Sequence, residues 1–159
     1  MNDNTDVRRA DGGTHWSLLA FRRGRCSSDG RGGGDRFEHF DSSPAVSNRA
    51  AADALARSAA PSLGAAAVEA ANAVRHDPPD APKQTNGWDC GVYALAVARA
   101  LVEDFDRSNA ASAGAGADAG AARLRDALRG IDPARAAAFR GEMLRLVESL
   151  AEGGERGGG

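Results

Sequence analysis

The chain has 159 residues and a formal net charge of -2, so it suits one domain and gives no electrostatic reason to expect a nucleic-acid or anionic-membrane partner. Its two cysteines, Cys26 and Cys90, do not form a pair with metal-ligand spacing, and we predict no metal site. Because no secretory signal opens the chain and no apolar run approaches membrane-spanning length, we expect a soluble, intracellular protein with reduced thiols.

Two short strands are predicted near the start, at residues 14–21 and 36–41. The loop between them, residues 22–35, contains Cys26 and is longer than most hairpin connections. Neighbouring strands usually pair antiparallel, and a pairing of Phe21 with Asp35 sets His15 opposite Asp41, with Cβ atoms about 5 Å apart. A slip of one residue would place these two side chains on opposite faces, and the sequence does not fix the register.

The middle of the chain predicts one helix and one ambiguous segment. Residues 48–60 read as a helix with Ser47 or Asn48 as its cap, Leu55 inside and Pro61 ending it. Residues 63–74 fit either a helix or a strand, and the proline-rich residues 77–82 are predicted to be an extended loop.

The last third of the chain predicts an insert and two more helices. Residues 107–120 are rich in Ala, Ser and Gly and are predicted to be a disordered low-complexity insert. Helices are expected at 121–130 and 133–151, with residues 152–159 as a disordered tail. Asp132 is the expected cap of the last helix, and its expected inner face comprises Phe139, Met143, Leu146, Val147 and Leu150. One domain would then comprise residues 1–106 and 121–151.

A polar run stops abruptly at Cys90, and residues 90–101 are almost wholly apolar. Asn86-Gly87 is a turn signal, Asp89 is a good N-cap, and the following segment predicts a helix buried on most sides. Cys90 then lies in the first turn, where the unpaired N–H groups favour a thiolate and can also bind an oxyanion. The alternative is an ordinary core cysteine, since free cysteine is among the most buried residue types.

A cysteine protease needs a thiolate, an imidazole, a group that orients the imidazole, and donors for the oxyanion. Cys90 is the candidate nucleophile, His15 the base and acid, and Asp41 the orienting carboxylate. Gln84 can supply its side-chain amide to the oxyanion beside the backbone N–H of Cys90. His39 and His76 are alternative bases, although His39 is too near Asp41 along the strand and His76 falls in a loop where a solvated histidine is expected. A histidine and an aspartate on paired strands can equally be solvent-exposed residues without a catalytic role.

Three segments closely resemble the motif blocks of the ubiquitin-like-protein-specific cysteine proteases, the Ulp family. They are residues 12–19 (GGTHWSLL), 37–42 (FEHFDS) and 84–93 (QTNGWDCGVY), which present His, Asp, Gln and Cys in the family's order. Within the family, these segments most resemble those of the deneddylase branch, because Asn2-Asp3-Asn4 precedes the first block and Ser47-Asn48 follows the second. The resemblance continues into the last helix.

The resemblance implies an α+β, papain-like fold in which a central buried helix carries the cysteine and packs against a small mixed sheet. It implies a thiol isopeptidase that cleaves after the C-terminal Gly-Gly of a ubiquitin-like modifier, with Trp16 as one wall of the tunnel for that tail. The expected protein is a cytoplasmic or nuclear monomer without cofactor. Its expected partners are a modifier of the neddylation type and its conjugates.

Family members carry a further region before the His block, including the opposite tunnel wall, so we expect that the N-terminal part is missing from this chain. A SUMO-specific protease and a truncated, non-catalytic modifier-binding relative are the alternative interpretations.

Overall fold

A three-stranded mixed sheet forms the centre of the fold. The computed structural model describes residues 1–2, 13–24, 34–110 and 117–155, and at 117–119 and 153–155 it describes the backbone alone. Strand β1 (Leu18–Arg22) pairs antiparallel with β2 (Arg36–Phe40), and β2 pairs parallel with the short β3 (Arg75–His76). The observed strand order is β1-β2-β3.

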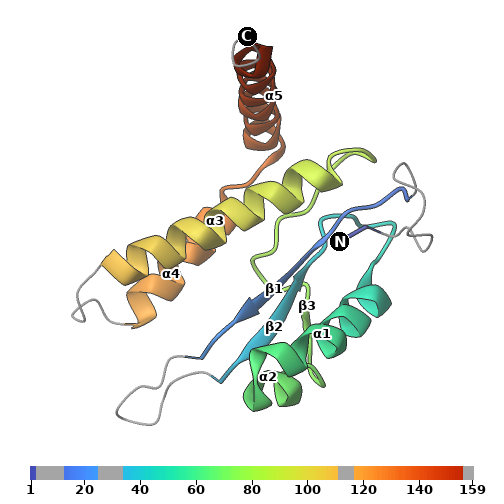
Figure 1. The fold of residues 1–159 in the computed structure, drawn as a ribbon, viewed down its shortest axis with the longest axis vertical. Coiled ribbons are helices and arrows are strands. Elements are labelled where there is room, and N and C mark those ends of the chain that lie inside the picture. Colours follow the sequence, from blue (N-terminus) through green and yellow to red (C-terminus); the bar gives the residue numbers. More distant parts are fainter. Residues whose placement is uncertain (3–12, 25–33, 111–116, 156–159) are drawn as a thin grey trace.

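Helices cover both faces of this sheet, as Figure 1 shows. Helices α1 (Arg49–Leu63) and α2 (Ala65–Ala70) lie on one side, and α3 (Cys90–Ala110) crosses the other side with α4 (Ala117–Arg129) packed against it. Helix α5 (Pro133–Glu155) projects away from these layers (Figure 1). The predicted α+β class, with a helix that begins at Cys90 packed on a small mixed sheet, is confirmed.

Alternation along the strands divides the core into two clusters. Even-numbered residues of β1, such as Leu18, face the α3 side, whereas odd-numbered ones, such as Phe21, face α1 and α2. The buried cluster on the α3 side comprises Phe40, Tyr93, Val97, Leu124, Leu128, Ile131 and Ala136. The cluster on the other side comprises Phe37, Ala56, Ala60, Ala67 and Ala71, so the small alanine side chains let α1 and α2 approach the sheet closely.

The register of β1 and β2 differs from the predicted one by two residues. Phe21 pairs with Phe37 and not with Asp35. The long loop between the strands permits either pairing, and the packing of Phe21 against the Phe37 ring, with centroids 5.0 Å apart, favours the observed one. Because side chains alternate with a period of two, a shift of two residues leaves every side chain on its predicted face.

Helix α1 is longer than predicted and buries a different face. Pro61 lies inside the helix, which continues to Leu63 and ends at Gly64, where φ is +112°. Proline removes one helical N–H donor, and this loss is tolerated next to the helix end because the alanine face packs on the sheet. Leu55, predicted to be inside, is 45% exposed. The buried positions are Ala52, Ala56 and Ala60.

The ambiguous segment 63–74 is mainly helical, as α2. Helix also extends into the predicted insert and the predicted tail: α3 runs to Ala110, α4 starts at Ala117, and α5 continues to Glu155. Ala110, Ala117 and Ala119 favour helix in the insert, whereas residues 152–155 contain two glycines and no alanine, so their composition does not explain the extension of α5. Residues 111–116 and 156–159, and Cys26, lie outside the described residues.

The inner face predicted for the last helix is wrong over its second half. Asp132 does cap α5, because its carboxylate accepts from the Arg135 N–H at 2.7 Å. Leu146, Val147 and Leu150, however, are 58%, 63% and 66% exposed. The 3.6-residue periodicity identifies an apolar stripe but not what covers it.

Helix α3 is also less buried than predicted. Leu95, Val102 and Phe105 are 53%, 57% and 62% exposed, while Tyr93 and Val97 face the core. The sheet covers only one side of this helix.

Candidate active site

Cys90 lies at the first position of α3, as predicted, and is 5% exposed. The preceding turn is built by Asn86, whose side-chain oxygen accepts from the N–H groups of Trp88 and Asp89 at 3.1 and 3.0 Å. The helix starts with the Tyr93 N–H bonded to the Asp89 carbonyl at 2.9 Å. This places the sulfur among first-turn N–H groups, whose partial positive charge stabilises a negative sulfur.

The Asp89 carboxylate has two further partners. It accepts from the Asn86 side-chain amide at 2.7 Å and pairs with Arg140 of α5. The turn that precedes Cys90 is therefore tied to the last helix as well as to its own backbone.

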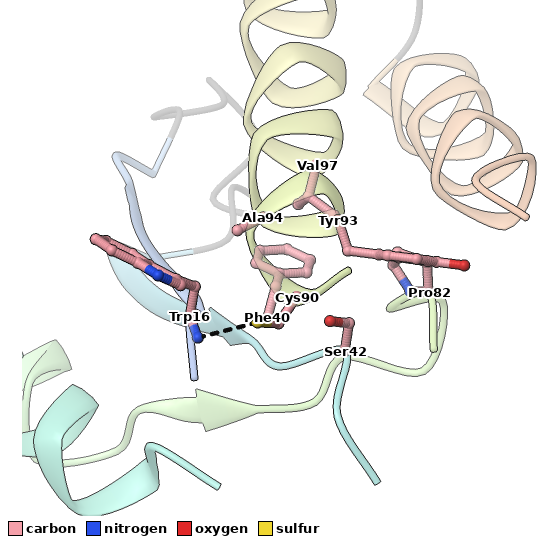
Figure 2. A pocket seen from close by; sticks show the side chains of 8 residues that line it. All are labelled: Trp16, Phe40, Ser42, Pro82, Cys90, Tyr93, Ala94 and Val97. Carbon is pink, nitrogen blue, oxygen red and sulfur yellow. Dashed lines mark hydrogen bonds between the residues drawn. The ribbon is translucent and has the colours of Figure 1, made fainter. Parts of the chain in front are cut away.

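A hydrogen bond joins Cys90 to the residue that follows His15. The Trp16 backbone N–H donates to Cys90 Sγ at 3.4 Å, as Figure 2 shows. Because Trp16 directly follows His15 in the chain, this contact brings the start of β1 to the start of α3.

His15 and Asp41 form a buried pair. The His15 Nε2 atom lies 2.7 Å from Asp41 Oδ1, and both side chains are 3% exposed. A carboxylate only accepts, so His15 donates from Nε2. The other contacts of Asp41 come from the backbone N–H groups of Ser43, to Oδ1 at 3.1 Å, and Asn48, to Oδ2 at 3.1 Å. Three donors hold this carboxylate in place. The carboxylate in turn selects the His15 tautomer that carries its proton on Nε2.

The predicted contact of His15 with Asp41 thus forms although the register differs. Both residues lie just beyond the ends of the paired strands, where the two-residue shift makes them diagonal neighbours on one face. Asn48, predicted as a helix cap, uses its side chain otherwise and donates to Ser17 Oγ at 3.2 Å.

Gln84 is 5% exposed and its amide is held from two sides. Its Oε1 accepts from the Ser42 hydroxyl at 2.7 Å, and its Nε2 donates to the Asn86 carbonyl at 2.6 Å. The Asn86 carbonyl can only accept, so it determines which end of the amide is nitrogen. One of the two N–H hydrogens is used by Asn86, and the other is the candidate donor to an oxyanion.

A small cavity adjoins the sulfur. It has a volume of about 10 Å³, and its lining includes Trp16, Phe40, Ser42 and Cys90 (Figure 2). The Trp16 side chain is 51% exposed at this edge. A space this small holds about one water molecule and no side chain.

The other two histidines form contacts with residues outside the His15–Asp41 pair. His39 is completely buried and bonds to Ser17 Oγ at 2.9 Å and to His76 at 3.1 Å. His76 was predicted to be a solvated loop residue, but it belongs to β3 and bonds to Asp53 of α1 at 2.9 Å. This pairing of β3 with β2 joins residues far apart in the sequence, which no local pattern indicates.

The sequence did not predict several polar contacts of the site. Ser42 and Asn48 hold Gln84 and Asp41, and Lys83 donates to the Asp41 carbonyl at 2.6 Å and to Asp77 at 2.9 Å. Serine and asparagine are common in turns, so their identity alone gives no signal for these roles.

In the part of the chain that the structure describes, no group of three or more His, Cys, Asp and Glu side chains is placed to hold a metal ion. No helix among those residues has the length and apolar character needed to cross a membrane.

Comparison with known proteins gives consistent matches. Residues 9–128 match the family model described as Ulp1 protease family, C-terminal catalytic domain. NEDD8-specific protease 1 of Arabidopsis thaliana is 37% identical over 105 residues, which cover 66% of this chain and 40% of that protein. Sentrin-specific protease 8 of Homo sapiens is 30% identical over 152 residues, which cover 96% of this chain and 58% of that protein. The chain spans about half the length of these curated relatives.

Proposed function

Because this chain belongs to the Ulp1 protease family, as its sequence motifs predicted, we propose that it is a cysteine peptidase that cleaves after the C-terminal Gly-Gly of a ubiquitin-like modifier. The name of the Arabidopsis thaliana relative, NEDD8-specific protease 1, favours a modifier of the NEDD8 type, and removal of that modifier from its conjugates is the proposed activity. The observation that carries the proposal is the Trp16 N–H bond to Cys90 Sγ at 3.4 Å, because it joins the sulfur to the segment of the buried His15–Asp41 pair.

In the proposed reaction, the Cys90 thiol gives its proton to His15, and the resulting thiolate attacks the carbonyl carbon of the modifier's last glycine. The oxyanion that forms accepts hydrogen bonds from the Cys90 backbone N–H and the Gln84 amide. The C–N bond then breaks, and His15 gives its proton to the leaving amine, which leaves a thioester on Cys90. Water attacks the thioester as His15 takes one of its protons, the C–S bond breaks, the modifier leaves as its carboxylate, and the sulfur recovers the proton from His15.

Trp16 is the proposed contact for the Gly-Gly tail. Its half-exposed indole lies at the edge of the cavity beside the sulfur. An aromatic face packs closely against a backbone without side chains, so glycine is the residue that this narrow space favours.

The proposal is tested by covalent labelling. The purified chain is incubated with NEDD8 or with SUMO, each carrying an electrophile in place of its C-terminal carboxylate, and adducts are resolved by mass. We expect one NEDD8 adduct, which disappears in Cys90→Ala and persists in the matched control Cys26→Ala. Replacement of the probe's last two glycines by alanine should abolish it.

Other outcomes overturn the proposal in distinct ways. Labelling by SUMO alone replaces the NEDD8-type substrate with SUMO. Binding of NEDD8 without labelling identifies a non-catalytic modifier-binding protein. Labelling that survives in Cys90→Ala rejects Cys90 as the nucleophile.

A further inference from the structure

Four consecutive hydrogen bonds, buried or half-buried, connect helix α1 to the residues next to the His15–Asp41 pair. They start at Asp53 on α1, pass through His76 and His39, and end at Ser17 and Asn48. The successive donor-to-acceptor distances are 2.9 Å, 3.1 Å, 2.9 Å and 3.2 Å. The proposed reaction uses none of these five side chains directly.

The chemistry of the end groups determines where each proton lies. The Asp53 carboxylate only accepts, so His76 carries its proton on Nε2, and a neutral His76 presents Nδ1 as an acceptor. His39 must then donate from Nδ1 and accept at Nε2. The Ser17 hydroxyl donates to that nitrogen, and its oxygen accepts from the Asn48 amide. Each bond thereby has one donor and one acceptor.

This assignment requires that both His76 and His39 are neutral, and the surroundings of His39 favour its neutral form. The residue is 0% exposed, and burial lowers the pKa of its imidazole. The nearby carboxylates of Asp41 and Asp77 raise the pKa, whereas His76 and the amino terminus lower it further.

The far end of the chain of bonds reaches the candidate active site. The Asn48 side-chain amide lies 3.2 Å from Ser17 Oγ and 3.5 Å from the His15 carbonyl. The backbone N–H of the same residue donates to Asp41 Oδ2 at 3.1 Å. A rotation of the Ser17 hydroxyl therefore changes the contacts of a residue that holds both members of the pair.

We propose that His39 is a positioning residue for the His15–Asp41 pair. Its Nδ1-protonated form, selected by His76 and Asp53, directs the Ser17 hydroxyl and through it the Asn48 amide. The role in turnover rests on the proposed function, whereas the placement of the protons does not.

The proton placement is tested by NMR on the full chain labelled with ¹⁵N-histidine, through two-bond nitrogen–proton correlations near pH 7.5. We expect His39 to be protonated at Nδ1 and bare at Nε2, and His76 to show the opposite pattern. In Ser17→Ala the Nε2 resonance of His39 should shift, because its donor is lost. A His39 protonated at Nε2, or a charged His39, overturns the proposal.

The positioning role is tested by kinetics with the NEDD8 probe. Ser17→Ala should lower the labelling rate constant about tenfold without a change in the probe concentration at half-saturation. The matched control Ser62→Ala, an exposed serine on α1, should leave both quantities unchanged. His39→Gln keeps an acceptor toward Ser17 and should retain more of the rate than His39→Leu, with thermal unfolding measured on each variant.

The outcomes separate this proposal from the proposed function. If the unsubstituted chain is not labelled, the proposed peptidase activity is rejected, and the role of His39 in turnover is rejected with it. The NMR experiment still tests the placement of the protons independently of activity. An active chain whose rate is unchanged by Ser17→Ala rejects the positioning role only.

Discussion

At the scale of single residues, the Asp41 carboxylate is held by three hydrogen-bond donors. Each of its oxygens accepts at least one hydrogen bond, from His15 and Ser43 on one side and from Asn48 on the other. An amide in its place must turn an NH2 group toward one of these N–H donors. The site therefore depends on a carboxylate and not merely on a side chain of this shape.

The substitution Asp41→Asn tests this dependence. We expect labelling by the NEDD8 probe to slow by about 10²-fold, because the His15 imidazole loses its orienting charge. The melting temperature should also fall, since two N–H donors then face each other in a buried position. Asp106→Asn, at an exposed position of α3, is the matched control. A normal rate in Asp41→Asn would remove Asp41 from the orienting role.

At the scale of elements, one buried carboxylate links all three strands. Glu38 of β2 is 5% exposed and lies 3.5 Å from Arg22 of β1, 3.1 Å from Arg36 and 3.6 Å from Arg75 of β3. The arginines reach solvent, so these pairs are partly screened. Their combined contribution should lie between that of an exposed and that of a buried ion pair.

Glu38→Gln should lower the free energy of unfolding by about 1–2 kcal/mol, because it removes the charge but keeps the shape. Urea unfolding followed by circular dichroism measures this difference. The matched control Glu69→Gln, at an exposed position of α2, should change the free energy by less than about 0.5 kcal/mol. Equal effects of the two substitutions would show that the three-strand link does not stabilise the sheet.

The elements also show how far the sequence alone can go. Local signals placed the start of α3 at Cys90 and the cap of α5 at Asp132, because turn and cap preferences act over a few residues. Parity along the strands was enough to bring His15 to Asp41, since a two-residue shift preserves the face. The place of His76 could not be predicted, because β3 pairs with a strand distant in the sequence. The roles of Ser42 and Asn48 depend on such distant pairings too.

At the scale of the whole molecule, α5 divides into an anchored and an exposed half. Its first half has Ala136 in the core, and Arg99 of α3 bonds to Glu142 at 2.9 Å and lies over the Phe139 ring at 5.6 Å. In the second half, the apolar side chains of Leu144, Leu146, Val147 and Leu150 are all more than half exposed. Burial and not helix propensity supplies most helix stability, so this half should contribute little to the fold.

Deletion of residues 144–159 tests that division. We expect the melting temperature to change by about 2 °C or less, because side chains that stay exposed on folding bury little apolar area. Replacement of the buried Ala136 by Asp, in the anchored half, should lower it by far more, since it places a charge in the core. A large loss on deletion would mean that the exposed stripe is covered in solution, and light scattering of the intact chain would then distinguish a second copy from contacts within one chain.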